Sequence, residues 1–280
     1  MKGGYILVNG KFHRENEPLF TSLDLSRLSK EIKESFRTEN NFILFAEANY
    51  TYLLNALSAV ELQAPKDWDL HRLKHDVSRL LNKNHLFLAA KVNIHFIQGA
   101  DNTDYILTAE EIPRGFYPLN EQGLMIDFYN DGVKSDTKLN SYEPSSRFLW
   151  ISASNIAVSK SQHNMILFNK KGYACEGIAS SFGYLKDNSA IFPSQDSCGY
   201  QPPLNSTIIK CTKMCGFKVL VKDNISHDDL LNADELFLID NCLGIQKILG
   251  LDSRRYYSAK TTAIALKLKE LAMKEIENGH

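Results

Sequence analysis

The stretch MILFNKKGYACEGIASSFGYLKD, residues 165–187, decides the fold. Its apolar start, residues 165–168, meets a polar turn, residues 169–172, that closes with a glycine, and a second run of small and apolar residues follows. Two such runs around a tight turn predict a β-hairpin. Glu176 lies inside the second run, where a carboxylate is unusual because a buried Glu is rare unless it is paired. The alternative is that Glu176 lies at a strand end and reaches solvent.

The composition excludes several classes of protein. The chain has 280 residues, 44% hydrophobic and 23% charged, enough for one large domain or two of moderate size. The 32 basic and 33 acidic residues give a net charge of −1, which gives no support for binding nucleic acid or an anionic membrane surface. No apolar run is long enough to span a membrane, and the start MKGGYILVNGKF lacks the pattern of a signal peptide. We therefore expect a cytoplasmic protein.

The cysteines and histidines predict neither a disulfide framework nor a metal site. An odd number of cysteines at irregular spacing argues against a disulfide framework. Cys211 and Cys215 lie four apart on an expected helix, but no matching Cys or His pair follows them. His71 and His75 have the same spacing and no nearby third ligand, so we interpret them as solvated. The cysteines, which we interpret as reduced, are Cys175, Cys198, Cys211, Cys215 and Cys242.

Periodicity and turn residues predict two α+β domains. The N-terminal domain is expected over 1–112, the segment 113–123 with its two prolines and two glycines is the expected linker, and the C-terminal domain covers 124–280. In the first domain we expect a hairpin at 5–12 around Asn9-Gly10, helices at 25–36, 47–60 and 68–81, and strands at 87–98 and 105–107. In the second we expect a strand at 124–129, a polar loop at 130–141, helices at 148–158, 207–215 and 258–277, and strands at 191–193 and 217–221.

Several motifs, in order along nearly the whole chain, resemble those of the class IV aminotransferases, the fold-type IV pyridoxal-phosphate (PLP) enzymes. Residues 172–177 (GYACEG) stand at the family's Gly-Tyr…Thr-Glu-Gly, residues 34–37 (ESFR) at its Glu-Thr-x-Arg, and residues 233–246 at its Ala-Asp-Glu…Gly-Ile-Gln. The resemblance implies a two-domain α+β fold, with a smaller N-terminal α/β domain and a larger C-terminal pseudo-barrel domain. It also implies PLP bound between the domains, a homodimer, and a small amino or carboxylate ligand.

The resemblance also implies the cofactor-binding residues. Glu176 takes the place of the glutamate that pairs with the pyridinium nitrogen of PLP. The family's phosphate-binding Arg is replaced by Thr51, and Pro203 stands where the family has the Gly of its phosphate-cradling helix start. The cofactor-binding set is then Glu176, Arg37, Thr51, Leu204, Asn205, Asn241 and Cys242.

A PLP enzyme also needs a lysine that forms a Schiff base with the cofactor. Aligning backwards from Glu176 without a gap places Glu143 at the family's lysine position, and a carboxylate cannot form that bond. Lys138 reaches the position only with an insertion of about five residues. The plainer interpretation is that Lys134 and Lys138 are solvated loop lysines.

Three functions remain open on this sequence. The first is a PLP-dependent aminotransferase or aminodeoxychorismate-type lyase that uses Glu176 and Lys138; the segment Gly244–Gln246 favours the lyases and D-amino-acid aminotransferases over the branched-chain enzymes. The second is a non-catalytic homologue, a dimer that binds a small ligand or a partner. The third is an acid–base enzyme without cofactor, built on Glu143 and Glu176, since paired carboxylates can divide the roles of acid and base.

Overall fold

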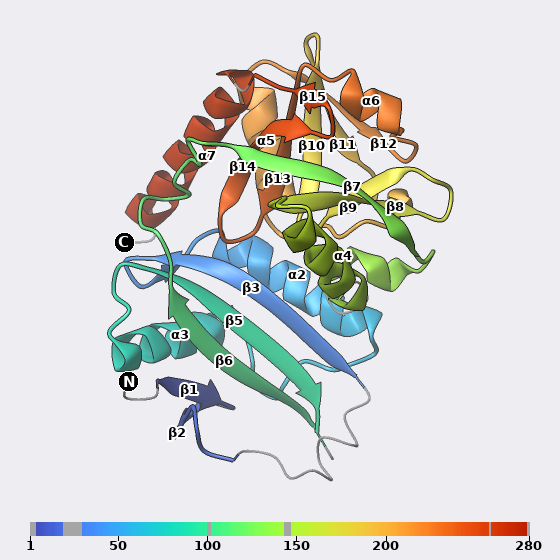
Figure 1. Ribbon diagram of the computed structural model, residues 1–280. Coiled ribbons are helices and arrows are strands. Elements are labelled where there is room, and N and C mark those ends of the chain that lie inside the picture. Colours follow the sequence, from blue (N-terminus) through green and yellow to red (C-terminus); the bar gives the residue numbers. More distant parts are fainter. Residues whose placement is uncertain (1–3, 19–29, 100–101, 143–146, 258, 279–280) are drawn as a thin grey trace. The chain divides into compact units, whose positions relative to one another are not determined.

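The computed structural model describes residues 4–18, 30–99, 102–142, 147–257 and 259–278. The chain forms two compact units: unit 1 comprises residues 1–116 and 275–280, and unit 2 comprises residues 117–274 (Figure 1). The division after Phe116 lies inside the segment 113–123, which we expected to link two domains. Residues 275–278 group with unit 1 and not with the C-terminal unit.

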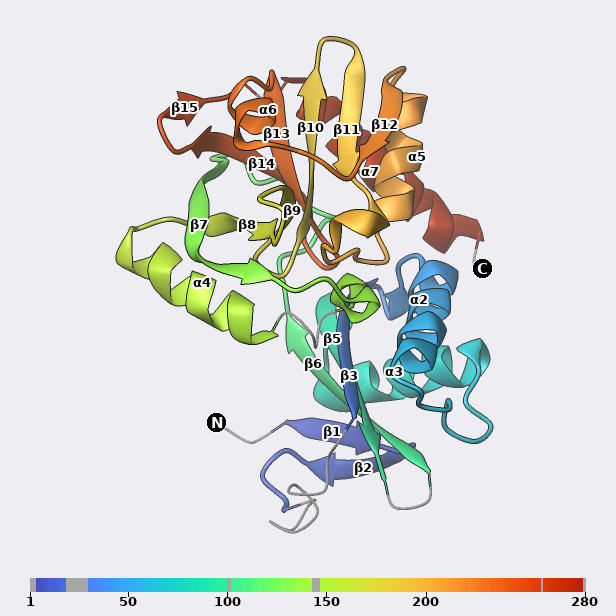
Figure 2. The same ribbon diagram turned by 90° about the vertical axis from the view of Figure 1, so that its right-hand side faces the viewer.

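Unit 1 is an antiparallel sheet covered on one face by two helices (Figure 2). Its strand order is β2-β1-β6-β5-β3-β4. The predicted hairpin around Asn9-Gly10 is confirmed, because both residues have positive φ angles, 49° and 81°. The elements are β1 (Tyr5–Val8), β2 (Lys11–Arg14), β3 (Glu31–Glu39), β4 (Phe42–Ile43), α2 (Ala46–Ala59), α3 (Leu70–Asn84), β5 (Ala89–Gln98) and β6 (Thr103–Glu111).

A buried carboxylate ties α3 to the sheet of unit 1. Asp76 accepts hydrogen bonds from Arg72 Nε (2.8 Å), Arg79 Nη1 (3.2 Å) and the Tyr105 hydroxyl (2.6 Å). Burial opposes ionisation of Asp76, but the hydrogen bonds from Tyr105 and Arg72 outweigh it, and the pKa of the carboxyl is lowered. Arg79 also donates to the carbonyl of Gly10, so the network fixes the first hairpin on the helix.

Unit 2 is built on one large mixed sheet with the strand order β12-β11-β10-β13-β14-β7-β8-β9. β14 pairs in parallel with β7 and antiparallel with β13, so it joins the two halves of the sheet. Helix α4 packs against β7 and β8 (Figure 2). The strands are β7 (Leu124–Lys134), β8 (Asn164–Asn169), β9 (Ala174–Gly177), β10 (Ser181–Lys186), β11 (Ser189–Pro193), β12 (Lys218–Lys222), β13 (Glu235–Asp240), β14 (Gly244–Leu251) and β15 (Arg254–Arg255). The helices are α4 (Arg147–Ser159), α5 (Asn205–Met214), α6 (His227–Leu231), α7 (Ala259–Asn278) and the 3₁₀ turns η1 (Lys138–Ser141) and η3 (Gln195–Ser197).

The central hairpin is present as predicted. β8 and β9 are antiparallel, with Glu176 opposite Leu167, and Gly172 in the turn has a φ of +79°. The side chain of Glu176 is 0% exposed, so the alternative of a solvent-reaching strand end is wrong. The core of unit 2 includes Ile166 of β8, Phe182 of β10 and Leu238 of β13.

Two element predictions are wrong. The helix expected over 25–36 is instead strand β3 from Glu31 onward, while residues 25–29 fall outside the described part. The apolar spacing of four that suggested a helix places Ile32 and Phe36 on one face of a strand equally well, because residues of the same parity share a face. The polar loop expected over 130–141 is also wrong, since β7 continues to Lys134 and η1 follows it.

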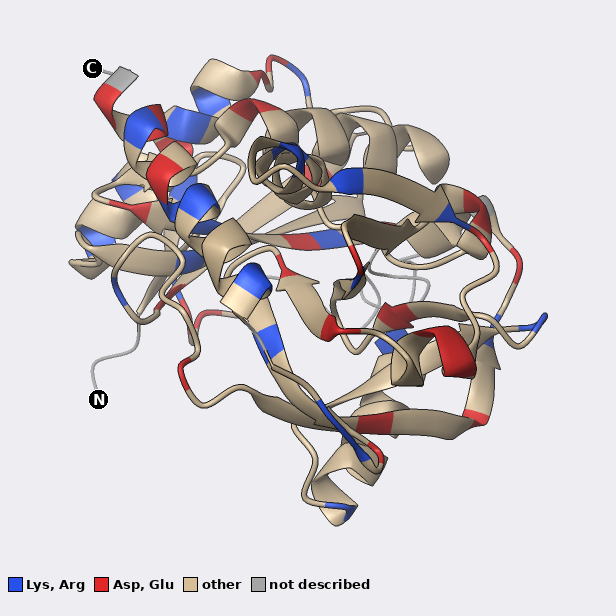
Figure 3. Cartoon of the chain, turned by 90° about the horizontal axis from the view of Figure 1, so that it is seen from above, with Lys and Arg blue, Asp and Glu red and all other residues tan. Residues whose placement is uncertain are grey.

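Charges of both signs are interspersed over the chain, as Figure 3 shows. Within the described ranges, no helix combines the length and apolarity needed to cross a membrane.

Candidate active site

An irregularity in β7 aims a lysine into unit 2. The pairing with β8 moves from Phe128 opposite Ile166 to Val133 opposite Phe168, so β7 carries extra residues at this point. Such bulges re-aim the side chains that follow them. Val133 is 56% exposed, whereas Lys134, the last residue of the strand, is only 2% exposed. The interpretation of Lys134 as a solvated loop lysine is therefore wrong.

The ammonium of Lys134 forms a buried ion pair with Glu176. Its Nζ donates to Oε2 of Glu176, and also to the backbone carbonyl of Asn140, at 2.9 Å. Both charged side chains are almost completely buried, and an isolated charge in the protein interior would be strongly unfavourable. Each charge thus depends on the other.

Two further donors fix the orientation of the Glu176 carboxylate. The indole Nε1 of Trp150 donates to Oε1 at 2.9 Å, and the backbone N–H of Tyr200 donates to Oε2 at 2.6 Å. The rings of Trp150 and Tyr200 pack edge to face, with centroids 5.2 Å apart. A carboxylate that accepts from three elements, a strand, a helix and a loop, has little freedom to rotate.

Gly199 makes the Tyr200 contact geometrically feasible. A Cβ on this residue would lie 1.9 Å from the carbonyl oxygen of Cys175, far inside van der Waals contact. Only glycine allows the loop before α5 to approach β9 this closely. The sequence alone does not show that position 199 requires glycine, because it does not tell which backbone segment lies against this residue.

Asn140 closes the amine side of the site. Its side chain is 0% exposed, and its Nδ2 donates to the carbonyl of Ser135. Its Oδ1, although buried, has no hydrogen-bond partner in the part of the chain that the structure describes.

Cys175 lies next to Glu176 in β9, where burial and then the charge of Glu176 raise the pKa of its thiol well above the ordinary value. We therefore expect a protonated, unreactive thiol beside the carboxylate.

The structure assigns neither of the two residues considered for the lysine role, Glu143 and Lys138, to this site. Glu143 lies outside the described residues. Lys138 begins η1, which places its backbone four residues beyond the end of β7. The lysine whose amine reaches Glu176 is Lys134, which sequence alignment set aside because it lies furthest from the expected position.

Of the other expected cofactor-binding residues of unit 2, Leu204, Asn205 and Asn241 meet at the start of α5. Leu204 caps this helix, and its N–H donates to Oδ1 of Asn241 at 3.1 Å. Asn205, the first helical residue, donates through Nδ2 to Gln201 at 2.6 Å. Cys242 follows Asn241, is buried, and donates its N–H to Asp240. The first-turn amides of a helix such as α5 are suited to anion binding.

The expected site residues of unit 1 have other surroundings. Arg37 is buried; its Nε donates to Glu39 at 2.9 Å and its Nη2 donates to the carbonyl of Pro113. Thr51 is exposed on α2. For metals, the described residues contain no group of three or more His, Cys, Asp or Glu side chains that could hold an ion.

Comparison with known proteins identifies the family and the fold. The family model for amino-transferase class IV matches residues 31–251. The fold is similar to that of a branched-chain aminotransferase from Thermoproteus uzoniensis, solved with norvaline (TM-score 0.84, 16% identity, 98% of this chain and 97% of that chain covered). It is similar to the Escherichia coli branched-chain aminotransferase (0.81, 17%, 94% and 92%) and to a hypothetical aminotransferase from Mycobacterium tuberculosis with α-ketoglutarate and PMP (0.84, 14%, 97% and 100%). No curated protein sequence gives a match. The motif order, the fold and the match over most of its length together make this chain a member of the class IV aminotransferase family.

Proposed function

We propose that the chain is a PLP-dependent enzyme of the aminotransferase type in which Lys134 supplies the amine that the family places at the position of Glu143. The observation that carries the proposal is the buried contact between the amine of Lys134 and the carboxylate of Glu176. A buried ion pair is weak evidence for stability, because well-packed apolar residues often do as well or better. An amine and a carboxylate kept together in the interior are therefore better explained by chemistry than by folding.

The residues present fit the two ends of PLP. Glu176 would hold the ring nitrogen, since Trp150 and Tyr200 keep its carboxylate in place when Lys134 moves away. A protonated ring nitrogen would then take over the compensation that the ammonium now gives. The first-turn amides of α5, after Leu204, would hold the phosphate. When bound, PLP supplies an electron sink for the charge left on the substrate carbon.

The chain's own residues would then divide three tasks. Lys134 Nζ carries a proton to or from the reacting carbon, and the carbonyl of Asn140 orients that amine. The rings of Trp150 and Tyr200 exclude water from one side of the carboxylate. The buried environment strengthens each of these electrostatic contacts.

The test is covalent capture of the cofactor. Purified protein mixed with PLP and reduced with borohydride should gain one phosphopyridoxyl group, which is the mass of PLP less one water and plus two hydrogens, and peptide mapping should place it on Lys134. K134R keeps the positive partner of Glu176 but should lose the label, whereas K138R, the matched control, should keep it. Label on Lys138 would restore the other lysine assignment and refute ours.

The second candidate is the non-catalytic homologue. It is supported by the exposed Thr51 at the family's Arg position and by Lys134 already saturating Glu176. In that case Lys134 acts as a permanent substitute for the ring nitrogen, and the protein should remain colourless and unlabelled with PLP.

The ligand class, assembly and location complete the proposal. The norvaline and α-ketoglutarate in the structures of similar proteins support a small amino or keto acid as the substrate. Lyase activity stays an alternative to transamination, and assay of both product types would separate them. We also propose a cytoplasmic homodimer, which analytical ultracentrifugation and fractionation would test.

A further inference from the structure

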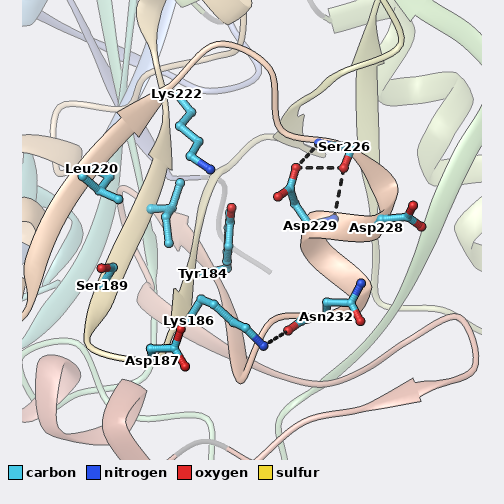
Figure 4. Close-up of a pocket in the computed structure, with 11 residues that line it drawn as sticks. Tyr184, Lys186, Asp187, Ser189, Leu220, Lys222, Ser226, Asp228, Asp229 and Asn232 are labelled. Atoms are coloured by element: carbon cyan, nitrogen blue, oxygen red, sulfur yellow. Dashed lines mark hydrogen bonds between the residues drawn. The ribbon is translucent and has the colours of Figure 1, made fainter.

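Unit 2 contains a cavity that shares no residue with the site around Glu176. It has a volume of about 340 Å³, near the lower end of small-molecule sites, which span roughly 300–1,000 Å³. Strands β10, β11 and β12 form one wall and the segment around α6 forms the other (Figure 4). Its lining includes Tyr184, Lys222, Asp229, Ile191 and Leu220.

Tyr184 points its hydroxyl into this cavity, between Lys222 and Asp229 (Figure 4). The residue is 3% exposed, and no hydrogen bond joins its hydroxyl to the other lining residues drawn in Figure 4. Burial, and then the charge of Asp229, raise the pKa of Tyr184 to about 12. The hydroxyl therefore stays protonated at neutral pH and can donate to an acceptor.

The ammonium of Lys222 and the carboxylate of Asp229 lie beside that hydroxyl (Figure 4). Lys222 extends its Nζ into the cavity, and no hydrogen bond joins it to the other lining residues drawn in Figure 4. Asp229 uses Oδ2 to accept from the N–H and Oγ of Ser226, both at 2.8 Å, and turns Oδ1 toward the cavity (Figure 4). Burial opposes ionisation of Asp229, but the Ser226 hydrogen bonds and the charge of Lys222 outweigh it and lower its pKa.

This polar end cannot be satisfied by an ion of one sign. An anion placed at Lys222 and Tyr184 would also meet the carboxylate of Asp229, and a cation at Asp229 would meet Lys222. A molecule that carries both charges on adjacent atoms would satisfy all three groups. The side chains of Ile191 and Leu220, which also line the cavity, offer apolar contact to the rest of the molecule.

We propose that this cavity binds a free α-amino acid with an apolar side chain. The carboxylate of the ligand accepts from Lys222 Nζ and the Tyr184 hydroxyl, its ammonium donates to Asp229 Oδ1, and its side chain packs along Ile191 and Leu220. The site lies outside the residues proposed for PLP, so it is a second, non-catalytic position for the class of molecule that the family transforms. The proposal does not depend on catalysis, because it concerns binding to the PLP-free protein.

The experiment is calorimetric titration of the PLP-free protein with L-leucine. Y184F and K222M should each weaken binding about tenfold or more, the loss expected for a hydrogen bond to a charged group. K218M is the matched control, since Lys218 is exposed on the same strand but outside the cavity, and it should bind as the unchanged protein does. K134R, which alters the Glu176 site, should also leave leucine binding unchanged.

The ligand series tests the zwitterion itself. N-acetyl-leucine and 4-methyl-2-oxopentanoate keep the carboxylate and the side chain but lack the ammonium, so we expect both to bind at least tenfold more weakly. Equal binding of these compounds would show an anion site and overturn the proposal. No binding of leucine, or loss of binding in K134R but not in K222M, would overturn it as well.

Discussion

Replacing Lys134 by methionine tests the buried ion pair most directly. Methionine keeps the apolar part of the lysine side chain but removes the ammonium. The Glu176 carboxylate, which is 0% exposed, then accepts hydrogen bonds from only two neutral donors, Trp150 and Tyr200. Removing one partner of a buried pair costs about 3–5 kcal/mol of unfolding free energy. We therefore expect K134M to lose about this amount from unit 2. Lys171→Met, an exposed position in the hairpin turn that carries Glu176, should change stability by less than about 0.5 kcal/mol.

The two tryptophans make the measurement specific. Trp68 lies in unit 1 and Trp150 in unit 2, so in a W68F background urea unfolding followed by fluorescence reports on Trp150. The double variant K134M/E176Q should lose less unfolding free energy than the sum of the losses in K134M and E176Q, and the difference, the coupling energy, should be about 0.5–3 kcal/mol. A loss below about 1 kcal/mol in K134M, with no coupling, would mean that Lys134 is solvated, and our reasoning about the site would fail.

Three further outcomes follow from contacts already described. D76N should destabilise unit 1 by about 1.5–3 kcal/mol in urea unfolding, because Asp76 accepts charge-assisted hydrogen bonds. Because folding lowers the pKa of Asp76, its carboxylate adds to the free energy of unfolding above pH 3.8, the ordinary pKa, and this addition is lost as pH falls through the lower, folded pKa. D76N should therefore show a flatter dependence of stability on pH in this acid range. G199A should destabilise unit 2 by at least about 1–3 kcal/mol and weaken PLP capture, and a thermal melt equal to that of the unchanged protein would contradict the predicted clash. In the folded protein iodoacetamide should label only the part-exposed Cys198 and Cys215, and mass spectrometry should find no label on the buried cysteines, Cys175, Cys211 and Cys242. Labelling should be slow at neutral pH, because burial raises the pKa of both part-exposed thiols, and faster as pH rises, because the thiolate is the form that reacts.

The sequence allowed much of the scaffold to be predicted. Hairpins with a glycine turn, such as those at Gly10 and Gly172, carry their geometry in local residues, and both are present. The capping box of Ser226 and Asp229 at the start of α6 is equally local, because its two residues lie three positions apart. Helices α2 and α3 followed from apolar spacing over more than three turns.

The lysine could not be predicted because its placement depends on strand pairing. Counting residues back from Glu176 assumes a regular register, but β7 carries extra residues opposite β8 and brings Lys134 to the site from a stretch that reads as a polar loop. The contact between Gly199 and β9 depends in the same way on residues far apart in the sequence. Local composition contains neither fact.

The position of β14 has a consequence for biosynthesis. The strands on one side of it, β7 to β9, are complete by residue 177, and those on the other, β10 to β13, by residue 240, but the strand between them spans 244–251. During translation, the strand that joins the two halves of the sheet is therefore the last of its main strands to leave the ribosome. Such late closure makes folding slow and exposes strand edges to association. Chains that stop before residue 244 should accumulate as aggregates, and chaperones that shield strand edges should improve the yield of this protein more than slower synthesis does.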